Sequence, residues 1–369
     1  MRVTRLSVRD FRNHARAELE LGERLTVLYG PNGAGKTNLL EALYFACLGR
    51  SCRTSNEREM VRLGQPLTRV EVEGVAADGR HTLEVGFAPG EPRRAAADGA
   101  RVERLPDVPF RPLVAVFLPE RLELVRGAPG GRRAHLDQFV AALWPARSLT
   151  RASYSQALGQ RNAALARVRR GASPSLLDPW DAELARHGAQ LMADRAEAAQ
   201  LLAGPFAERA GELGLPGPAR LRHRPRSPAS NAGELAAELE ERRATDLDRG
   251  FTTHGPHRDE LELSHDGRLL RTFGSQGQQR VALLALLFAE RDALLARGRA
   301  PLMLLDDVMS ELDGQRRERL SDLVLAGGQA VVTSTELAHV PGHDLPGVVV
   351  ALVEDGAVSP AEVAVGAPL

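Results

Sequence analysis

The chain has 369 residues, of which 43% are hydrophobic and 26% charged, and its formal net charge is zero. That length suffices for one large or two modest domains, and no apolar run approaches the ~20 residues that a transmembrane helix needs. A balanced net charge neither indicates nor excludes nucleic acid as a partner, because only clustered positive charge attracts DNA. Charged and apolar residues alternate over 1–10, which argues against a signal peptide, so we expect a cytoplasmic protein.

A phosphate-binding loop is the strongest pattern in the sequence. It has the form G-x-x-x-x-G-K-[ST] and consists of Gly30, Pro31, Asn32, Gly33, Ala34, Gly35, Lys36 and Thr37, followed by Asn38. A strand-like segment precedes it and a helix-like segment follows it. Lys36 is also the sole lysine in the sequence, which favours a task that arginine cannot perform. We predict an ATP site in which Lys36 is catalytic and reaches the β- and γ-phosphates, and Thr37 is a ligand of Mg²⁺.

An apolar run near the C-terminal end closes in two acids. Leu302–Leu305 is typical of a buried parallel strand, and Asp306 and Asp307 follow it at the strand end where open α/β sheets bind ligands. We predict Asp306 as the second protein ligand of Mg²⁺. Asp307 is the predicted catalytic residue that orients or activates the attacking water.

The segment between these two halves resembles the signature motif of the ABC ATPases. Ser275, Gly277 and Gln278 form the pattern S-x-G-Q at the start of a predicted apolar helix. Residues 310–313, after the two acids, resemble the D-loop of the same ATPases. In that family the signature motif binds the nucleotide held by the opposite protomer. The resemblance therefore implies an ATP-dependent homodimer with two composite sites.

More than two-thirds of the chain separates the phosphate loop from the acidic strand, which predicts an insertion. Strand patterns at 68–75 and 80–88 resemble the antiparallel sheet layer of ABC-type heads. We predict an α/β fold, an ATPase head of the ABC and SMC type with a mixed sheet, helices and that antiparallel layer. This discontinuous lobe is expected at 1–125 and 250–369, with a mainly α-helical second lobe inserted at 126–249.

Two basic runs lie inside the predicted helical lobe. Residues 138–177 contain no acid and carry Arg147, Arg151, Arg161, Arg167, Arg169 and Arg170, and a second run has four arginines at 220–226. Contact with a DNA backbone and a solvated helix face explain such runs about equally well. Few aromatics interleave with the arginines, which favours duplex backbone contact over base stacking. The pair His254 and His257 lacks further ligands, and we prefer a structural role to a metal site.

Motifs distributed over nearly the whole chain resemble those of the RecF family. The matching segments are Phe11-Arg12-Asn13, residues 35–42 with 49–51, Pro119-Glu120, residues 130–137, Thr253-His254-Gly255-Pro256-His257-Arg258-Asp259, and residues 304–313. The resemblance implies ATP-dependent dimerisation on duplex DNA near single-strand gaps, and loading of RecA together with RecO and RecR. Weak hydrolysis would then release the clamp. It further implies that Arg12 and Asn13 touch the nucleotide, although both could equally form a strand-end turn.

Three rival functions are weaker. The ATPase subunit of a membrane transporter would normally have a switch histidine at the end of the strand at 330–335, and this chain has Ser334 or Thr335 in that place. A chromosome-organising SMC protein needs long heptad arms, which are absent from the sequence. A fused nuclease would need a further carboxylate cluster. The segment at 356–369 is rich in small residues, and a frayed tail and a partner contact both remain open for it.

Overall fold

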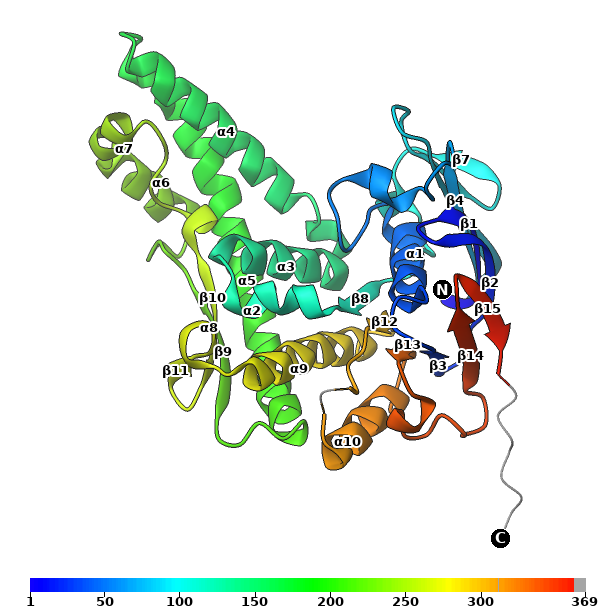
Figure 1. The fold of residues 1–369 in the computed structure, drawn as a ribbon. Coiled ribbons are helices and arrows are strands. Elements are labelled where there is room, and N and C mark those ends of the chain that lie inside the picture. The colour runs from blue at the N-terminus through cyan, green and yellow to red at the C-terminus, as the bar shows by residue number, and fades with distance from the viewer. Residues whose placement is uncertain (311, 362–369) are drawn as a thin grey trace. The chain divides into compact units, whose positions relative to one another are not determined.

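A computed structural model describes residues 1–310 and 312–361 (Figure 1). The chain divides into two compact units, Met1–Arg121 with Leu294–Leu369, and Leu122–Ala293. The first crossing lies close to the predicted boundary at 125, whereas the return lies well beyond the predicted residue 250. Residues 260–265 pair with a strand of the inserted segment, and this pairing holds them in the second unit.

The central sheet of the first unit has six strands. Their order is β15 (Ala357–Pro360), β14 (Val349–Glu354), β3 (Leu25–Tyr29), β13 (Gln329–Ser334), β12 (Leu302–Leu305) and β8 (Val114–Phe117). All neighbours are parallel except β15, which pairs antiparallel with β14 at one edge. Every residue of β12 is buried, as a strand covered on both faces requires. Strand β15 lies within the segment at 356–369 whose role was left open.

The second sheet of this unit is antiparallel. Its order is β2 (His14–Glu20), β1 (Arg2–Phe11), β4 (Thr68–Ala76), β5 (Gly79–Phe87), β6 (Arg94–Ala97) and β7 (Ala100–Val102). Burial alternates along β4, so one face is in the core and the other is in solvent. The predicted antiparallel layer is therefore present.

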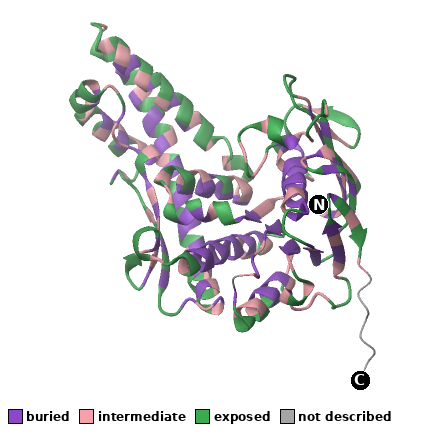
Figure 2. Cartoon of the chain, viewed as in Figure 1, coloured by how far each residue is buried: buried purple, intermediate pink, exposed green. Residues whose placement is uncertain are grey.

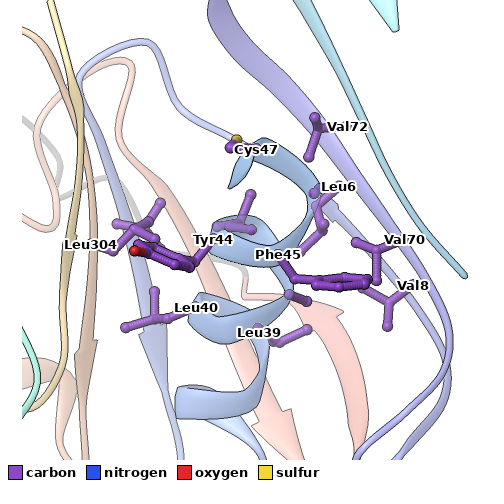
Figure 3. Packing of buried hydrophobic residues seen from close by; sticks show 14 of the residues in the cluster. Leu6, Val8, Leu39, Leu40, Tyr44, Phe45, Cys47, Val70, Val72 and Leu304 are labelled. Atoms are coloured by element: carbon purple, nitrogen blue, oxygen red, sulfur yellow. The ribbon is translucent and has the colours of Figure 1, made fainter. Parts of the chain in front are cut away.

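Helix α1 (Lys36–Leu48) packs between the two sheets, and ten of its residues are buried. Phe45 points to the antiparallel sheet, toward Val8 and Val70, whereas Leu40 and Tyr44 point toward Leu304 of β12 (Figure 3). A helix that is apolar on both sides is typical of a central core element. This packing fixes the start of α1, and therefore the phosphate loop, relative to the end of β12. Helix α10 (Gly314–Leu325) completes the unit.

The second unit is mainly helical. It contains α2 (Glu123–Arg126), α3 (Pro129–Leu143), α4 (Thr150–Val168), α5 (Asp178–Glu212), α6 (Ala232–Glu241), α7 (Arg243–Arg249), α8 (Leu270–Phe273) and most of α9 (Gln276–Leu295). A three-stranded antiparallel sheet, β11 (Arg268–Leu269), β10 (Glu260–His265) and β9 (Ala219–Arg224), accompanies the helices. Residues 281–289 of α9 are all buried (Figure 2). Among the described residues, no helix is both long enough and apolar enough to cross a membrane.

Candidate functional site

The phosphate loop lies between β3 and α1, as predicted. Gly30, Gly33 and Gly35 have φ values of 148°, 84° and 115°, conformations that side chains rarely adopt. At Gly35 a Cβ atom would also lie 2.6 Å from His14 Nε2 and 2.7 Å from the Asn13 side-chain amide. Glycine is therefore required there both for its backbone conformation and for space. Glycine-rich loops of this kind allow backbone N–H groups to converge on an anion, which makes this loop a candidate phosphate site.

The ammonium group of Lys36 lies inside this loop. Nζ donates to the carbonyl oxygens of Gly30 at 2.6 Å and Pro31 at 2.8 Å. Burial lowers the pKa of Lys36, and the negative charges of Asp307 and Asp306 partly oppose that shift. These contacts hold the cation beside the loop, where it can exchange carbonyl oxygens for phosphate oxygens.

The hydroxyl of Thr37 and the carboxylate of Asp306 meet although about 270 residues separate them. Thr37 Oγ1 donates to the carboxylate and lies 2.9 Å and 3.0 Å from its two oxygens. Burial raises the pKa of Asp306, and hydrogen bonds from Thr333 and Thr37 oppose that rise. A hydroxyl and a carboxylate are the hard oxygen donors that Mg²⁺ prefers. No cluster of three or more His, Cys, Asp or Glu residues that could hold a metal occurs among the described residues. The remaining ligands would have to be phosphate and water oxygens.

Asp307 occupies a strained position next to that pair. Its φ is 47°, in the left-handed region that costs a non-glycine residue roughly 1–2 kcal/mol. Its backbone N–H donates to Thr333 Oγ1 at 2.9 Å, and its carbonyl accepts from Ser310 Oγ at 3.1 Å. Oδ1 is buried and has no hydrogen-bond partner among the described residues. An unpaired buried carboxylate oxygen lowers the stability of the fold, so such groups are found mainly where function requires them. The oxygen can accept a proton from water.

Arg12 and Asn13 lie beside the loop, but both side chains are already engaged. Arg12 donates through Nε and Nη2 to the fully buried carboxylate of Glu41, at 2.9 Å and 2.8 Å. Asn13 donates to Ala34 O at 3.0 Å and accepts from Asn38 Nδ2 at 2.8 Å. These contacts brace the loop and the start of α1.

His14 is a further bracing residue that the sequence did not indicate. Its side chain is fully buried, and its ring nitrogens lie 3.1 Å from Gly35 O and 2.7 Å from Gly356 O. Gly356 N in turn donates to Ala34 O at 3.0 Å. The turn between β14 and β15 therefore contacts the phosphate loop. Only the sheet order brings these segments together, and no local pattern signals it.

The signature segment opens helix α9 with a reciprocal capping arrangement. Ser275 N donates to Gln278 Oε1 at 2.9 Å, and Gln278 N donates to Ser275 Oγ at 3.2 Å. Gly277 is open, since an added Cβ would meet only Ser275 Oγ, at 4.0 Å. The start of a 20-residue helix carries partial positive charge and can hold an anion. Glu311 of the D-loop-like segment lies outside the described residues.

Strand β13 was expected to have Ser334 or Thr335 at the position of the switch histidine, but the side chain that it contributes to the site is that of Thr333. Ser334 Oγ donates to the nearby Glu336 O at 2.7 Å. It is Thr333, one residue earlier, whose hydroxyl reaches the acids and donates to Asp306 Oδ1 at 2.7 Å. Sequence reasoning missed Thr333 because strand register decides which of three successive hydroxyl residues faces the site.

The prediction that Arg161 contacts DNA is wrong, because the side chain is buried. Its side chain has 0% exposure and forms ion pairs with Asp181 at 2.5 Å and Asp246 at 2.6 Å. It also donates to Thr252 Oγ1 at 2.8 Å and Leu239 O at 3.3 Å. A buried cation needs such partners, and here they come from outside the acid-free segment 138–177. Arg161 therefore cannot contact DNA in this fold.

The other five arginines are accessible to different degrees. Arg147 is half-buried and donates to Asp194 at 3.1 Å and Glu197 at 2.7 Å. The exposed residues are Arg151, Arg167, Arg169 and Arg170. The second basic run is a strand, with Arg220, Arg222 and Arg224 on the exposed positions of β9.

The two histidines of the T-H-G-P-H-R-D segment are structural. His257 Nε2 donates to Thr252 O at 3.0 Å, so its Nδ1 accepts from Tyr154 Oη at 2.7 Å. Burial lowers the pKa of His257 to about 4, which keeps the ring neutral. His254 lies 3.8 Å from Glu238. Neither histidine has the ligand set of a metal site.

Comparisons of this chain with known sequences give results that agree with one another. The family described as "AAA domain" matches residues 5–91. The DNA replication and repair protein RecF of Streptomyces avermitilis is 39% identical over 358 residues, which cover 93% of this chain and 95% of that protein. The protein of the same name from Anaeromyxobacter sp. is 41% identical over 372 residues, covering 98% and 99%.

Solved structures show the same fold. The recombination mediator protein RecF with ATP, of the RecFOR pathway, has a TM-score of 0.85 at 27% identity over 97% of both chains. The Smc head bound to the C-winged helix domain of ScpA has a TM-score of 0.62 at 16% identity over 98% and 97%, a likeness of fold alone. The predicted ATPase-head fold is thereby confirmed.

Proposed function

The chain belongs to the RecF family of DNA replication and repair proteins, and we propose that it is an ATP-dependent DNA clamp of recombinational repair. It is an ATPase of the head type found in RecF and Smc proteins. The observation that supports the proposal best is the meeting of Thr37 and Asp306 at 2.9 Å, beside a phosphate loop of the correct geometry. This contact joins the two motifs from which we expect a nucleotide site, and it supports the ATP-dependent part of the proposal.

Each part of the site has one task. Residues 30–38 form the phosphate site, in which backbone N–H groups of the glycine-rich loop bind the phosphates and Lys36 pairs with the β- and γ-phosphates. Asp307 takes a hydrogen bond from the attacking water through its unpaired Oδ1. Arg12 and Asn13 act on the nucleotide through the loop, by holding the segments that bind it.

Mg²⁺ fits the oxygen pair of Thr37 and Asp306. Both donors are hard oxygens, and the buried carboxylate of Asp306 is disfavoured in its charged form until a cation compensates it. Thr37 and Asp306 would hold the ion, which would supply positive charge to offset that of the nucleotide phosphates. The two side chains would have to give up their mutual hydrogen bond, which is a small local change.

ATP closes a homodimer through the signature segment. Ser275 Oγ and the open backbone at Gly277 present an anion site at the start of α9. This site accepts the γ-phosphate of the nucleotide held by a second copy. Sedimentation of Asp307→Asn with ATP tests it, because blocked hydrolysis should accumulate the dimer. A monomer at saturating ATP would contradict the dimer.

The ATP-bound dimer holds duplex DNA near single-strand gaps. Exposed arginines at the end of α4, namely Arg167, Arg169 and Arg170, are the candidates for phosphate contact. We propose further that the protein acts in the cytoplasm on nucleoid DNA, with RecO and RecR, to promote RecA loading, which agrees with the replication and repair role in the name of its relatives. Hydrolysis opens the clamp.

The decisive experiment is equilibrium binding to a gapped duplex at fixed salt, with and without ATP. We expect binding that requires ATP and is lost in Lys36→Met and in Ser275→Arg. Salt must be held constant because phosphate contacts make affinity salt-dependent. ATP binding without ATP-dependent DNA binding would retain the ATPase and refute the DNA function.

A further inference from the structure

Thr333 links the two acids of the site through a single hydroxyl group. Its side chain is fully buried at the end of β13. Oγ1 donates its one proton to Asp306 Oδ1 at 2.7 Å and accepts the backbone N–H of Asp307 at 2.9 Å. One hydroxyl therefore satisfies one group of each neighbouring acid, with donor and acceptor roles fixed.

The two hydrogen bonds have different consequences. The bond to Asp306 fixes the rotation of its carboxylate, so that the other contacts of that group point at Thr37. The bond from Asp307 N at 2.9 Å holds this residue in its left-handed conformation, φ 47°. Without the hydroxyl, the Asp307 N–H would be left unsatisfied and the strained turn would relax toward ordinary backbone angles.

We propose that Thr333 is a positioning residue for ATP hydrolysis, which orients the Mg²⁺-side carboxylate of Asp306 and the water-side carboxylate of Asp307 together. The proposal rests on the functions assigned above to the two acids. Thr333 acts through the two acids, which take both hydrogen bonds of its hydroxyl. Residues that orient metal ligands from behind typically change metal affinity or activity by roughly 10- to 100-fold when they are removed.

Thr333→Val tests the proposal, because valine keeps the shape and removes the hydroxyl. We expect nucleotide affinity in EDTA to stay within about twofold, since the loop and Lys36 are untouched. The gain in ATP affinity on adding Mg²⁺ should fall by roughly 10- to 100-fold, and kcat should fall at least as much as KM rises. A fluorescent ATP analogue measures the first two quantities without any turnover.

Two control variants separate positioning from packing. Thr333→Ser keeps the hydroxyl and should restore the Mg²⁺ response and kcat to near the parent values. Ser334→Ala removes a hydroxyl that bonds to Glu336 O and should change neither. If Thr333→Val does not fold, Thr333→Ala replaces it in the same measurements.

The outcomes distinguish the inference from the function beneath it. A normal Mg²⁺ response and kcat in Thr333→Val, or an equal loss in Thr333→Ser, overturns the positioning role. Asp307→Asn is measured alongside. If it abolishes hydrolysis while Thr333→Val has no effect, the proposed function stands and only the role of Thr333 fails. Normal hydrolysis in Asp307→Asn refutes the assignment of the acids, and the inference with it.

Discussion

The variant Arg161→Met discriminates between two explanations of Arg161 in the arginine-rich segment 138–177. The residue is either a DNA contact or a member of a buried ion-pair network. The structure has the guanidinium at 0% exposure between Asp181 and Asp246, themselves almost fully buried. Methionine is unbranched, uncharged and close to arginine in volume, so it fills most of the space but leaves two carboxylates without their main partner.

The expected cost follows from the partners that remain. Breaking a buried ion pair by removing one member costs about 3–5 kcal/mol. Asp181 keeps a hydrogen bond from Arg243 Nε at 2.7 Å, and Asp246 keeps those from Thr253 N at 2.9 Å and Thr253 Oγ1 at 2.6 Å. These contacts place the loss at the lower end, about 3 kcal/mol. With an m-value of about 2 kcal/mol/M, the urea midpoint falls by roughly 1.5 M.

The assay can follow the second unit alone. The chain has two tryptophans, Trp144 and Trp180, and both lie within Leu122–Ala293. Intrinsic tryptophan fluorescence during urea unfolding therefore reports this unit. Arg161→Lys should lie between parent and Met, because lysine keeps a charge but loses the planar fork.

Arg167→Met is the matched control. Arg167 is exposed on the same helix, and its replacement should change stability by no more than ~0.5 kcal/mol. If Arg167 contacts phosphate, the slope of log K against log salt should fall by about one in this variant. An unchanged urea midpoint in Arg161→Met together with a reduced salt slope would refute the buried-network reasoning.

Three further predictions follow from the site and its surroundings. Lys36→Met should lower ATP affinity by roughly 10- to 100-fold, the value of a charged hydrogen bond, in a fluorescent-nucleotide titration of protein with a parental circular dichroism spectrum. Without nucleotide, Asp306→Asn should raise the melting temperature at neutral pH, because burial raises the pKa of Asp306 and disfavours its charged form. This gain in stability should shrink as the pH falls toward the ordinary pKa of 3.8, where the parent carboxylate also becomes neutral. A variant that melts below the parent at pH 8 would contradict this reasoning. His257→Gln should abolish a loss of stability that the parent shows at acid pH. The folded-state pKa of His257, about 4, lies below the ordinary 6.5, so the parent should lose up to about 3 kcal/mol of unfolding free energy as the pH falls from 6.5 to 4. Urea unfolding followed by tryptophan fluorescence at several pH values measures this difference.

The nucleotide site was largely predictable because its parts are local motifs. A phosphate loop needs glycines at fixed positions to reach positive φ, and that requirement is written in one short segment. The acids likewise follow directly on an apolar strand. Thr37 and Asp306 could be paired in advance because parallel strands present their C-terminal ends at one edge of the sheet.

The charged residues were harder to predict because burial is a property of the fold. Arg161 occupies one position in an exposed-looking helix, and its acids come from residues 181 and 246. Composition within a window cannot show such partners. The same limit applies to the return of the chain to the first unit, since β10 belongs with β9 by strand pairing rather than by local sequence.

Strand register is what finally assembles the catalytic end of the sheet. In the parallel pair β12–β13, Leu305 lies opposite Val332, so the next residue of each strand brings Asp306 level with Thr333. A slip by one residue would offer Val332 or Ser334 to the acids and would exchange the side chains between the two faces of the strand, so that both faces would have to repack. All six residues of β13 are buried, so such a slip is strongly disfavoured. The hydrophobic pattern that buries β13 therefore also selects which hydroxyl reaches Asp306, and the Thr333 variants test that link between core packing and catalysis.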